Sequence, residues 1–316
     1  MDAPDLPPTI EAIEAAAERI AAHVRRTPVI DVGPEVGGPV SCALKLELLQ
    51  HTGSFKPRGA FNRVLATRVP DAGIIAASGG NHGAAVAHVG AALDLPTEIF
   101  VPEAAPAIKL RRLADSPATV TRAGALYDDA QAASDERART TGALVVHPYD
   151  MHDVVAGQGT VGREFDHQAP DLDTVLVAVG GGGLIAGVAS WFRGRVRVVA
   201  VEPERSRCLG AAIEAGEPVD VDVSGVASDS LGARRVGGLA FAAAPWIDRA
   251  VTVADDEIVA TQRLLWDRMR LIVEPGGATA LAALRHGAYV PAPSERVGVV
   301  VCGANADPTT IASEVG

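Results

Sequence analysis

Short apolar runs alternate with longer segments of mixed character along most of the chain. The runs are continuous in their apolar residues, and they include CALKLELL, GIIAAS, TEIFVP, ATVTRA, ALVVHP, DTVLVAVG, VRVVAVEP and RVGVVVCG. Segments of helical length lie between most of them, at 81–93, 105–114, 126–141 and 184–192. Continuous apolar strands separated by helices are typical of a parallel sheet with helices on both faces. The pattern therefore predicts an α/β protein with mostly parallel strands.

The number of predicted strands indicates two open-sheet α/β lobes. About eight strands exceed one mononucleotide-type unit. No segment rich in Pro, Gly or Ser marks a clean boundary between two halves of the chain. This organisation favours a smaller lobe inserted into a larger one. We expect a large domain of residues 1–68 and 150–316, and a small inserted α/β domain of residues 69–149.

Glycine-rich turns follow three of the predicted strands. They are IIAASGGNHG at 74–83, VLVAVGGGGLIAG at 175–187 and VGVVVCGAN at 297–305. A fourth, IVEPGGATA at 272–280, lies between two helical segments. Open parallel sheets bind ligands beyond the carboxyl ends of their strands. We therefore expect the ligand site where these turns meet.

The tetraglycine turn indicates a bound phosphate. Residues 180–183 follow an apolar strand and open a helix at Leu184, so successive backbone N–H groups can surround an anion. Residues 181–186 also satisfy G-x-G-x-x-A, and Glu202 ends the next strand, where a ribose could bind. From these residues alone, a nicotinamide dinucleotide, another phosphate ligand and a packing turn without a ligand are all open alternatives.

Lys56 stands at the start of a predicted helix, immediately before Pro57, in the stretch TGSFKPRGAFNRVLA at 52–66. A helix N-terminus carries partial positive charge, which disfavours an ammonium group and favours the neutral amine. A neutral amine is a nucleophile. The competing interpretation is that Lys56 points into water, as most lysines do.

The turn SGGNHG offers a hydroxyl, an amide and an imidazole from Ser78, Asn81 and His82. Such a group suits a carboxylate and a ring hydroxyl better than a second phosphate. The alternative is structural: Asn81 caps the following helix, and His82 is an ordinary surface residue.

Composition narrows the class of partner. The chain has 316 residues, a net charge of -11 and a pI near 5.2, which argues against nucleic acid or an anionic membrane as the main partner. It has no apolar run of membrane-spanning length, and its acidic start lacks an apolar signal core. The three cysteines show no CxxC spacing and the histidines are scattered, so we expect a cytoplasmic protein without a metal site.

A reactive lysine, a phosphate cup and a carboxylate-binding turn are what an enzyme using pyridoxal phosphate needs. The motifs SFKPRGA, SGGNHG, AGQGT, VGGGGL, VEP and CGAN occur here in the order found in the fold-type II pyridoxal phosphate enzymes. The chain resembles the branch of threonine and serine dehydratases and serine racemase, from about Thr9 to about Ile311. Cysteine synthases share that fold but have a different lysine motif, so they are more distant.

The resemblance implies a role for each matching residue. Lys56 would be the Schiff-base lysine and the base at Cα, with Phe55 packing near the cofactor ring. Asn81 would bind the ring hydroxyl. The remaining implied site residues are Gly180, Gly181, Gly182, Gly183 and Leu184 for the cofactor phosphate, Ser78, Gly79, Asn81 and His82 for the substrate carboxylate, and Cys302 for the pyridine nitrogen.

Cys302 stands where the family puts a Ser or Cys, and neither side chain holds the pyridine nitrogen protonated as an aspartate would. The ring is then a shallower electron sink, which favours prompt loss of a β-hydroxyl over long-lived carbanion chemistry. On the sequence alone, a small buried hydrophobic residue at the end of a strand explains Cys302 equally well.

Two positions depart from the resemblance. Serine racemase has a second serine where this chain has Gly79, and that serine is the acid or base on the opposite face of Cα. We therefore predict elimination and no racemisation. Some relatives bind a divalent cation with the Glu of VEP and an Asp six residues later; here the pair is Glu202 and Cys208, so we predict no metal.

We therefore expect pyridoxal-phosphate-dependent dehydration and deamination of L-threonine or L-serine to a 2-oxo acid and ammonia. Alternatives are a dehydratase of another β-hydroxy amino acid, such as 3-hydroxyaspartate or a bulkier β-substituted serine, and a serine racemase-like enzyme. A non-catalytic nucleotide-binding or ligand-sensing protein is the alternative from another class. The resemblance also implies a homodimer, to which residues 255–272 could contribute an apolar helix face.

Overall fold

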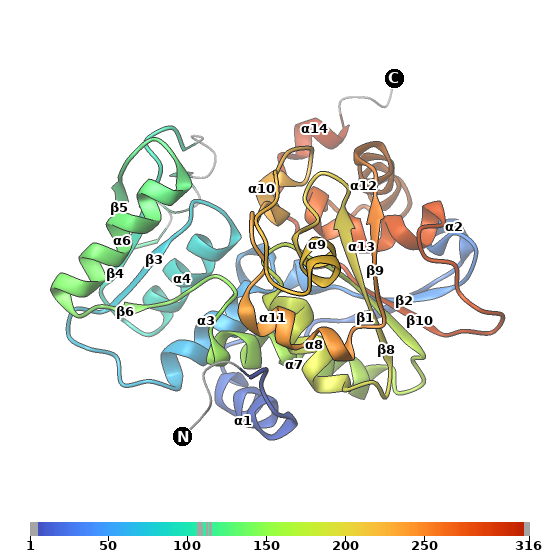
Figure 1. Cartoon of the computed structure of the whole chain (residues 1–316), viewed down its shortest axis with the longest axis horizontal. Coiled ribbons are helices and arrows are strands. Elements are labelled where there is room, and N and C mark those ends of the chain that lie inside the picture. Colours follow the sequence, from blue (N-terminus) through green and yellow to red (C-terminus); the bar gives the residue numbers. More distant parts are fainter. Residues whose placement is uncertain (1–5, 106–109, 112, 114–115, 313–316) are drawn as a thin grey trace.

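Two sheets organise the chain, which forms a larger and a smaller lobe (Figure 1). The computed structural model describes residues 6–105, 110, 111, 113 and 116–312. The larger sheet has six strands in the order β1-β2-β10-β7-β8-β9, and only the β1–β2 pair is antiparallel. Its strands are β1 (Val29–Val32), β2 (Cys42–Lys45), β7 (Thr174–Ala178), β8 (Arg197–Pro203), β9 (Arg249–Val253) and β10 (Val297–Val300).

The smaller sheet is all parallel and has four strands in the order β5-β4-β3-β6. Its strands are β3 (Ile74–Ala77), β4 (Thr97–Val101), β5 (Thr119–Arg122) and β6 (Leu144–Val145). All four lie between β2 and β7 in the sequence, so the smaller lobe is inserted into the larger one. The predicted α/β architecture with an inserted lobe is confirmed.

Helices cover the sheets and join their strands. They are α1 (Ile10–Ile20), α2 (Pro34–Gly37), α3 (Lys56–Leu65), α4 (Asn81–Ala92), α6 (Tyr127–Thr141), α7 (His152–Gln168), α8 (Gly183–Phe192), α9 (Cys208–Ala215), α10 (Ser228–Leu231), α11 (Gly238–Ala242), α12 (Asp255–Met269), α13 (Pro275–His286) and α14 (Pro308–Ala312), with 3-10 turns η1 (Glu47–Leu49), η2 (His51–Gly53) and η3 (Ala244–Trp246). The predicted helix at 105–114 lies largely outside the described residues. None of the described helices has the length and apolar content needed to cross a bilayer.

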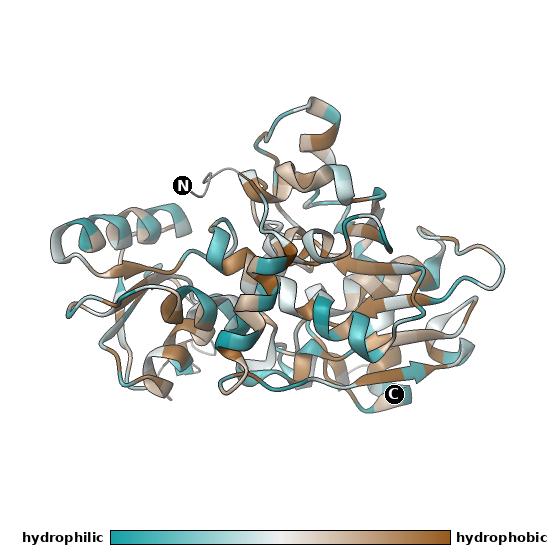
Figure 2. Ribbon diagram, turned by 90° about the horizontal axis from the view of Figure 1, so that it is seen from below, coloured by the Kyte–Doolittle hydropathy of each residue, from teal (hydrophilic) through white to brown (hydrophobic). Residues whose placement is uncertain are grey.

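The strands are continuous in apolar residues because helices bury both faces of each sheet. Every residue of β7 and of β10 is buried. Figure 2 shows brown, hydrophobic residues along the strands, whereas teal residues lie mainly on outward-facing helix turns. Helices α7 and α8 pack backbone to backbone, since a Cβ on Gly187 would overlap the backbone of Gly159. This contact accounts for a glycine of the AGQGT motif.

A buried ionic cluster ties the start of α3 to the larger lobe. The Arg58 guanidinium pairs with Glu47 on η1 at 2.7 Å and with Glu164 on α7 at 3.2 Å. The Lys45 amine, at the end of β2, contacts the same Glu164 carboxylate at 2.5 Å. Lys45 and Glu47 are fully buried, and Arg58 is 1% exposed. The cluster fixes α3 two residues after Lys56.

Candidate active site

All nine predicted cofactor residues line one cavity between the two lobes. The lining comprises Phe55, Lys56, Asn81, Tyr149, Ala178, Gly180, Gly181, Gly182, Gly183, Leu184, Ser230, Leu231, Glu274 and Cys302. These residues come from the starts of α3 and α4, the ends of β7 and β10 with the segments that follow them, the turn before α7, the helix α10 and the residue before α13. Residues from distant parts of the sequence therefore meet at the carboxyl ends of parallel strands, where open α/β sheets bind ligands.

The tetraglycine turn forms the base of this cavity. Within the described part of the chain, the backbone N–H groups from Gly180 to Leu184 have no hydrogen-bond acceptor. They precede the first full turn of α8, whose N-terminus adds partial positive charge. Gly182 has a φ of 92°, which only glycine adopts without strain. The turn therefore presents a ring of free donors to an anion.

The other glycines of the turn are required by close neighbours. A Cβ on Gly180 would lie 3.0 Å from Leu231 Cα, and a Cβ on Gly181 would overlap the ring of Tyr149. The Tyr149 ring therefore packs directly on the glycine turn. Side chains at these positions would collide with Leu231 and Tyr149 and would displace the turn.

Lys56 is the first residue of α3, and its side chain points into the cavity. Its Nζ donates a hydrogen bond of 2.7 Å to the Pro148 carbonyl and lies 5.1 Å from the centre of the Phe55 ring. The interpretation that Lys56 points into water is wrong. Burial lowers the pKa of its amine to about 8, and the nearby Cys302 and Glu274 partly oppose that change. The main cause is therefore desolvation, whereas the local sequence points to the helix dipole.

Asn81 is the first residue of α4, and its side chain crosses the cavity. Its Nδ2 donates a hydrogen bond of 2.6 Å to Glu274 Oε1, and its Oδ1 accepts one of 2.7 Å from Asn305 Nδ2. The N-cap of α4 is Gly80, so Asn81 does not cap its own helix. The chain of three polar side chains holds the Asn81 amide in one orientation.

The remaining residues of the SGGNHG turn do not line the cavity. The Ser78 Oγ accepts a hydrogen bond from the Gly80 backbone N–H at 3.2 Å. His82 is 4% exposed, and its Nε2 lies 2.7 Å from the Val146 carbonyl. Burial lowers the pKa of His82 to about 3, so the ring is neutral. His82 is thus a buried residue and not a surface one. Carboxylate binding by Ser78, Gly79 and His82 stays a prediction.

Cys302 follows β10 and faces the cavity with a neutral thiol. Its Sγ donates to the Gly276 carbonyl at 3.4 Å, and burial raises the pKa of the thiol strongly. The Cys302 carbonyl accepts a hydrogen bond of 3.2 Å from the Phe55 N–H. This bond holds the segment before Lys56 against the end of β10, and it brings the amine and the thiol into one cavity.

Three polar residues of the cavity, Glu274, Tyr149 and Ser230, are not predicted from the sequence. Glu274 lies in IVEPGGATA, where the glycines are the visible signal. Tyr149 lies in the turn HPYDMHD, whose position in space the sequence does not reveal. The sequence signal that could have indicated Glu274 is a carboxylate that stands just before a Pro-Gly-Gly turn.

The residues present fit a phosphorylated aldehyde with an aromatic ring. The neutral amine of Lys56 can attack an aldehyde, and the free N–H groups of the glycine turn can hold a phosphate. The amide of Asn81 can bind a ring hydroxyl, and the protonated thiol of Cys302 can face a ring nitrogen without giving it a full proton. Pyridoxal phosphate has all four features.

Comparison with known proteins agrees with this fit. Residues 20–303 match the model of the family described as pyridoxal-phosphate dependent enzyme. The chain is 36% identical to phenylserine dehydratase from Ralstonia pickettii, over 98% of this chain and 97% of that protein. It is also 36% identical to L-threonine ammonia-lyase from Geobacter sulfurreducens, over 95% of this chain and 76% of that protein.

Solved structures agree with the fold. Maize serine racemase superposes with a TM-score of 0.90 at 31% identity, covering 96% of each chain. A threonine deaminase from T.th. superposes with a TM-score of 0.88 at 33% identity, covering 95% of this chain and 99% of that one. The chain belongs to the pyridoxal-phosphate dependent enzyme family, in the branch of fold-type II that contains threonine dehydratases and serine racemases, and its cofactor is pyridoxal phosphate.

Proposed function

We propose that this protein is an ammonia-lyase that eliminates water from L-threonine or L-serine. The observation that carries the proposal is the partly neutral Lys56 amine, which faces a cavity whose base is a ring of free N–H donors. When bound, pyridoxal phosphate supplies an electron-withdrawing ring joined to the substrate nitrogen. The similarity to an L-threonine ammonia-lyase and to a threonine deaminase supports this substrate class.

The residues of the chain divide the remaining work. The Lys56 amine would take the Cα proton of the substrate onto Nζ, while the departing β-hydroxyl takes up one proton and leaves as water. The N–H groups from Gly180 to Leu184 would hold the cofactor phosphate. The Asn81 amide, which Glu274 fixes, would bind the hydroxyl of the cofactor ring. Loss of the β-hydroxyl as water, followed by hydrolysis of the carbon–nitrogen bond of the product, converts L-threonine to 2-oxobutanoate and ammonium. One water is released and one is consumed, so there is no net consumption of water.

Elimination without racemisation follows from Gly79. Racemisation needs a proton donor on the face of Cα opposite to Lys56, and glycine has no side chain to supply one. We expect L-serine to yield pyruvate and no D-serine. Detection of D-serine with the unaltered protein would contradict this part of the proposal.

A second substrate class is a serine with a bulky β-substituent. The chain is similar to a phenylserine dehydratase over nearly its whole length. Tyr127, at the start of α6, is 46% exposed. Its pKa is raised first by partial burial and then by the neighbouring Tyr149. The Tyr149 ring, which lines the cavity, could pack against an aryl group.

The test uses the purified protein. Pyridoxal phosphate is added and its visible absorption recorded, and then L-threonine, L-serine, threo-3-hydroxyaspartate and threo-phenylserine are supplied separately. Production of 2-oxo acid and ammonia from the first two substrates supports the main proposal, and preference for phenylserine supports the second. Full turnover by Lys56→Ala would refute the role of the lysine. Absence of any absorption band would favour a nucleotide-binding protein.

The finer points of organisation are also proposals. We propose that residues 1–68 and 150–316 form the large domain that binds pyridoxal phosphate, and that residues 69–149 form the small inserted α/β domain. We further propose a homodimer located in the cytoplasm, which size-exclusion chromatography with light scattering and cell fractionation would test.

A further inference from the structure

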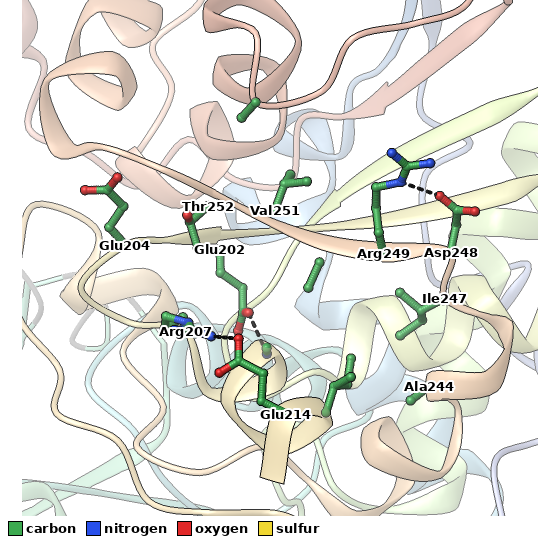
Figure 3. A pocket seen from close by; sticks show the side chains of 14 residues that line it. Glu202, Glu204, Arg207, Glu214, Ala244, Ile247, Asp248, Arg249, Val251 and Thr252 are labelled. Atoms are coloured by element: carbon green, nitrogen blue, oxygen red, sulfur yellow. Dashed lines mark hydrogen bonds and ion pairs between the residues drawn. The ribbon is translucent and has the colours of Figure 1, made fainter. Parts of the chain in front are cut away.

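A second cavity of about 830 Å³ opens beside the edge strand β9 (Figure 3). Its wall includes Glu202 from β8, together with Arg207 and Glu214, which form an ion pair across α9. Glu202 points from its strand toward the start of α9 (Figure 3). Although it borders this cavity, Glu202 is 0% exposed. The proposed reaction does not use it.

The Glu202 carboxylate binds the N-terminus of α9. Its Oε1 accepts a hydrogen bond from the Leu209 N–H and its Oε2 accepts one from the Gly210 N–H, each 2.8 Å long. Burial raises the pKa of Glu202 to about 7, while these two N–H groups act to lower it. A buried carboxylate therefore replaces solvent at the first turn of a helix and fixes that helix on β8.

Ser206, just before α9, and Cys208, its first residue, bond to the glycine turn 180–183 (the phosphate cup) or to a residue beside it. The Cys208 Sγ donates to the Gly180 carbonyl at 3.2 Å, and the Ser206 Oγ donates to the Leu231 carbonyl at 2.8 Å. Leu231 packs against Gly180, because a Cβ there would lie 3.0 Å from Leu231 Cα. Cys208 therefore acts on Gly180 directly, whereas Ser206 acts on Leu231, the residue that packs against Gly180.

The direction of the Gly180 carbonyl sets the direction of the Gly181 N–H, which is one of the donors of the cup. In a planar trans peptide the C=O and the following N–H point in opposite directions. The Cys208 thiol holds the Gly180 carbonyl on the side of α9, so the N–H of Gly181 points away from α9. Burial and the neighbouring Glu202 raise the pKa of the Cys208 thiol to about 12, so it stays a protonated donor.

We propose that Glu202, Ser206 and Cys208 form a support that positions the Gly180–Gly181 peptide for the cofactor phosphate. Glu202 holds α9 in place, and Cys208 and Ser206 transmit that position to the cup through two hydrogen bonds. All three are positioning residues, since none lines the cofactor cavity. The proposal rests on the glycine turn holding the phosphate, as in the proposed function, and it adds the residues that orient the turn.

The test compares two ligands that differ only in the phosphate. Apoprotein is titrated with pyridoxal phosphate and with pyridoxal, and the visible absorption gives both dissociation constants. We expect Cys208→Ala to weaken binding of pyridoxal phosphate about tenfold, the effect of losing one buried hydrogen bond to the cup. Binding of pyridoxal should change by less than about twofold. Cys208→Ser, which restores a donor, should recover most of the loss.

Matched controls separate support of the cup from general destabilisation. Cys42 on β2 is also a buried thiol, and Cys42→Ala should leave the ratio of the two constants unchanged. Ser206→Ala should change the ratio of the two dissociation constants in the same direction as Cys208→Ala. If Cys208→Ala fails to fold, Ser206→Ala tests the support independently.

Equal losses for both ligands, or equal ratios for Cys208→Ala and Cys42→Ala, would overturn the proposal. The titration does not require turnover. A parent protein that binds pyridoxal phosphate but converts no amino acid would refute the proposed function and leave this test readable.

Discussion

Glu47→Gln tests whether the buried ionic cluster holds the start of α3 in place. The Glu47 carboxylate accepts hydrogen bonds from Arg58 Nε at 2.8 Å and from Arg58 Nη2 at 2.7 Å. In the cluster, two cations, Lys45 and Arg58, face two carboxylates, Glu47 and Glu164. The substitution keeps the shape of the side chain and leaves two cations with a single anion.

The expected loss follows from this arrangement. Removing one partner of a buried ion pair costs about 3–5 kcal/mol, because the other charge is left without compensation. Arg58 keeps its contact with Glu164 at 3.2 Å, but Lys45 already binds that carboxylate at 2.5 Å. We therefore expect a decrease of about 3 kcal/mol in the free energy of unfolding, at the lower end of that range.

Urea unfolding of the apoprotein, followed by circular dichroism, measures the change. With a slope of about 3 kcal/mol per molar urea, the midpoint should fall by about 1 M. Glu136→Gln is the matched control, because Glu136 and its partner Arg139 are exposed by 59% and 72% and such pairs add little stability. A fall of less than about 0.3 M for Glu47→Gln, or an equal fall in both variants, would refute the reasoning.

Three further predictions concern the site. The rate at which apoprotein takes up pyridoxal phosphate should rise with pH and level off above about 8, because burial favours the neutral Lys56 amine; a rise that continues to 10.5 would contradict this cause. Turnover should be unchanged after dialysis against EDTA, since both Glu202 oxygens already accept backbone N–H groups, and stimulation by added Mg²⁺ would show the opposite. Gly182→Ala should lower the unfolding midpoint and cofactor affinity more than Gly194→Ala does. Both glycines have a positive φ, but only at Gly182 would the new Cβ meet a neighbour, Ala240.

Eight of the ten described strands could be predicted from the sequence, because continuous apolar strands and helical spacing are local patterns. The strands β1 and β9 were missed, because they lie at the edges of the larger sheet and are only partly buried. The predicted helices at 81–93 and 126–141 agree with α4 and α6 within one residue at each end. Partners distant in the sequence could not be predicted in this way. Asn81 could bind its own helix or a remote acceptor, and only the folded chain places Glu274, 193 residues later, beside it.

The cause of the lysine's reactivity was also out of reach of local reasoning. The helix dipole acts within one turn and can be inferred from Pro57 and its neighbours. Desolvation of the Lys56 amine depends on burial by segments from other parts of the chain, such as the one that contains Pro148. Likewise, nothing in the local sequence indicates that His82 is buried against the Val146 carbonyl.

The strand order has a consequence for synthesis on the ribosome. Strand β10 lies between β2 and β7, so the sheet of the larger lobe cannot close until the chain has been translated beyond Val300. The smaller sheet uses only consecutive strands between residues 74 and 145 and can form much earlier. During translation the apolar strands β7 and β8 therefore stay without the β10 neighbour of β7, beside a smaller lobe that is already folded. Chaperone dependence should accordingly concentrate in the second half of the chain.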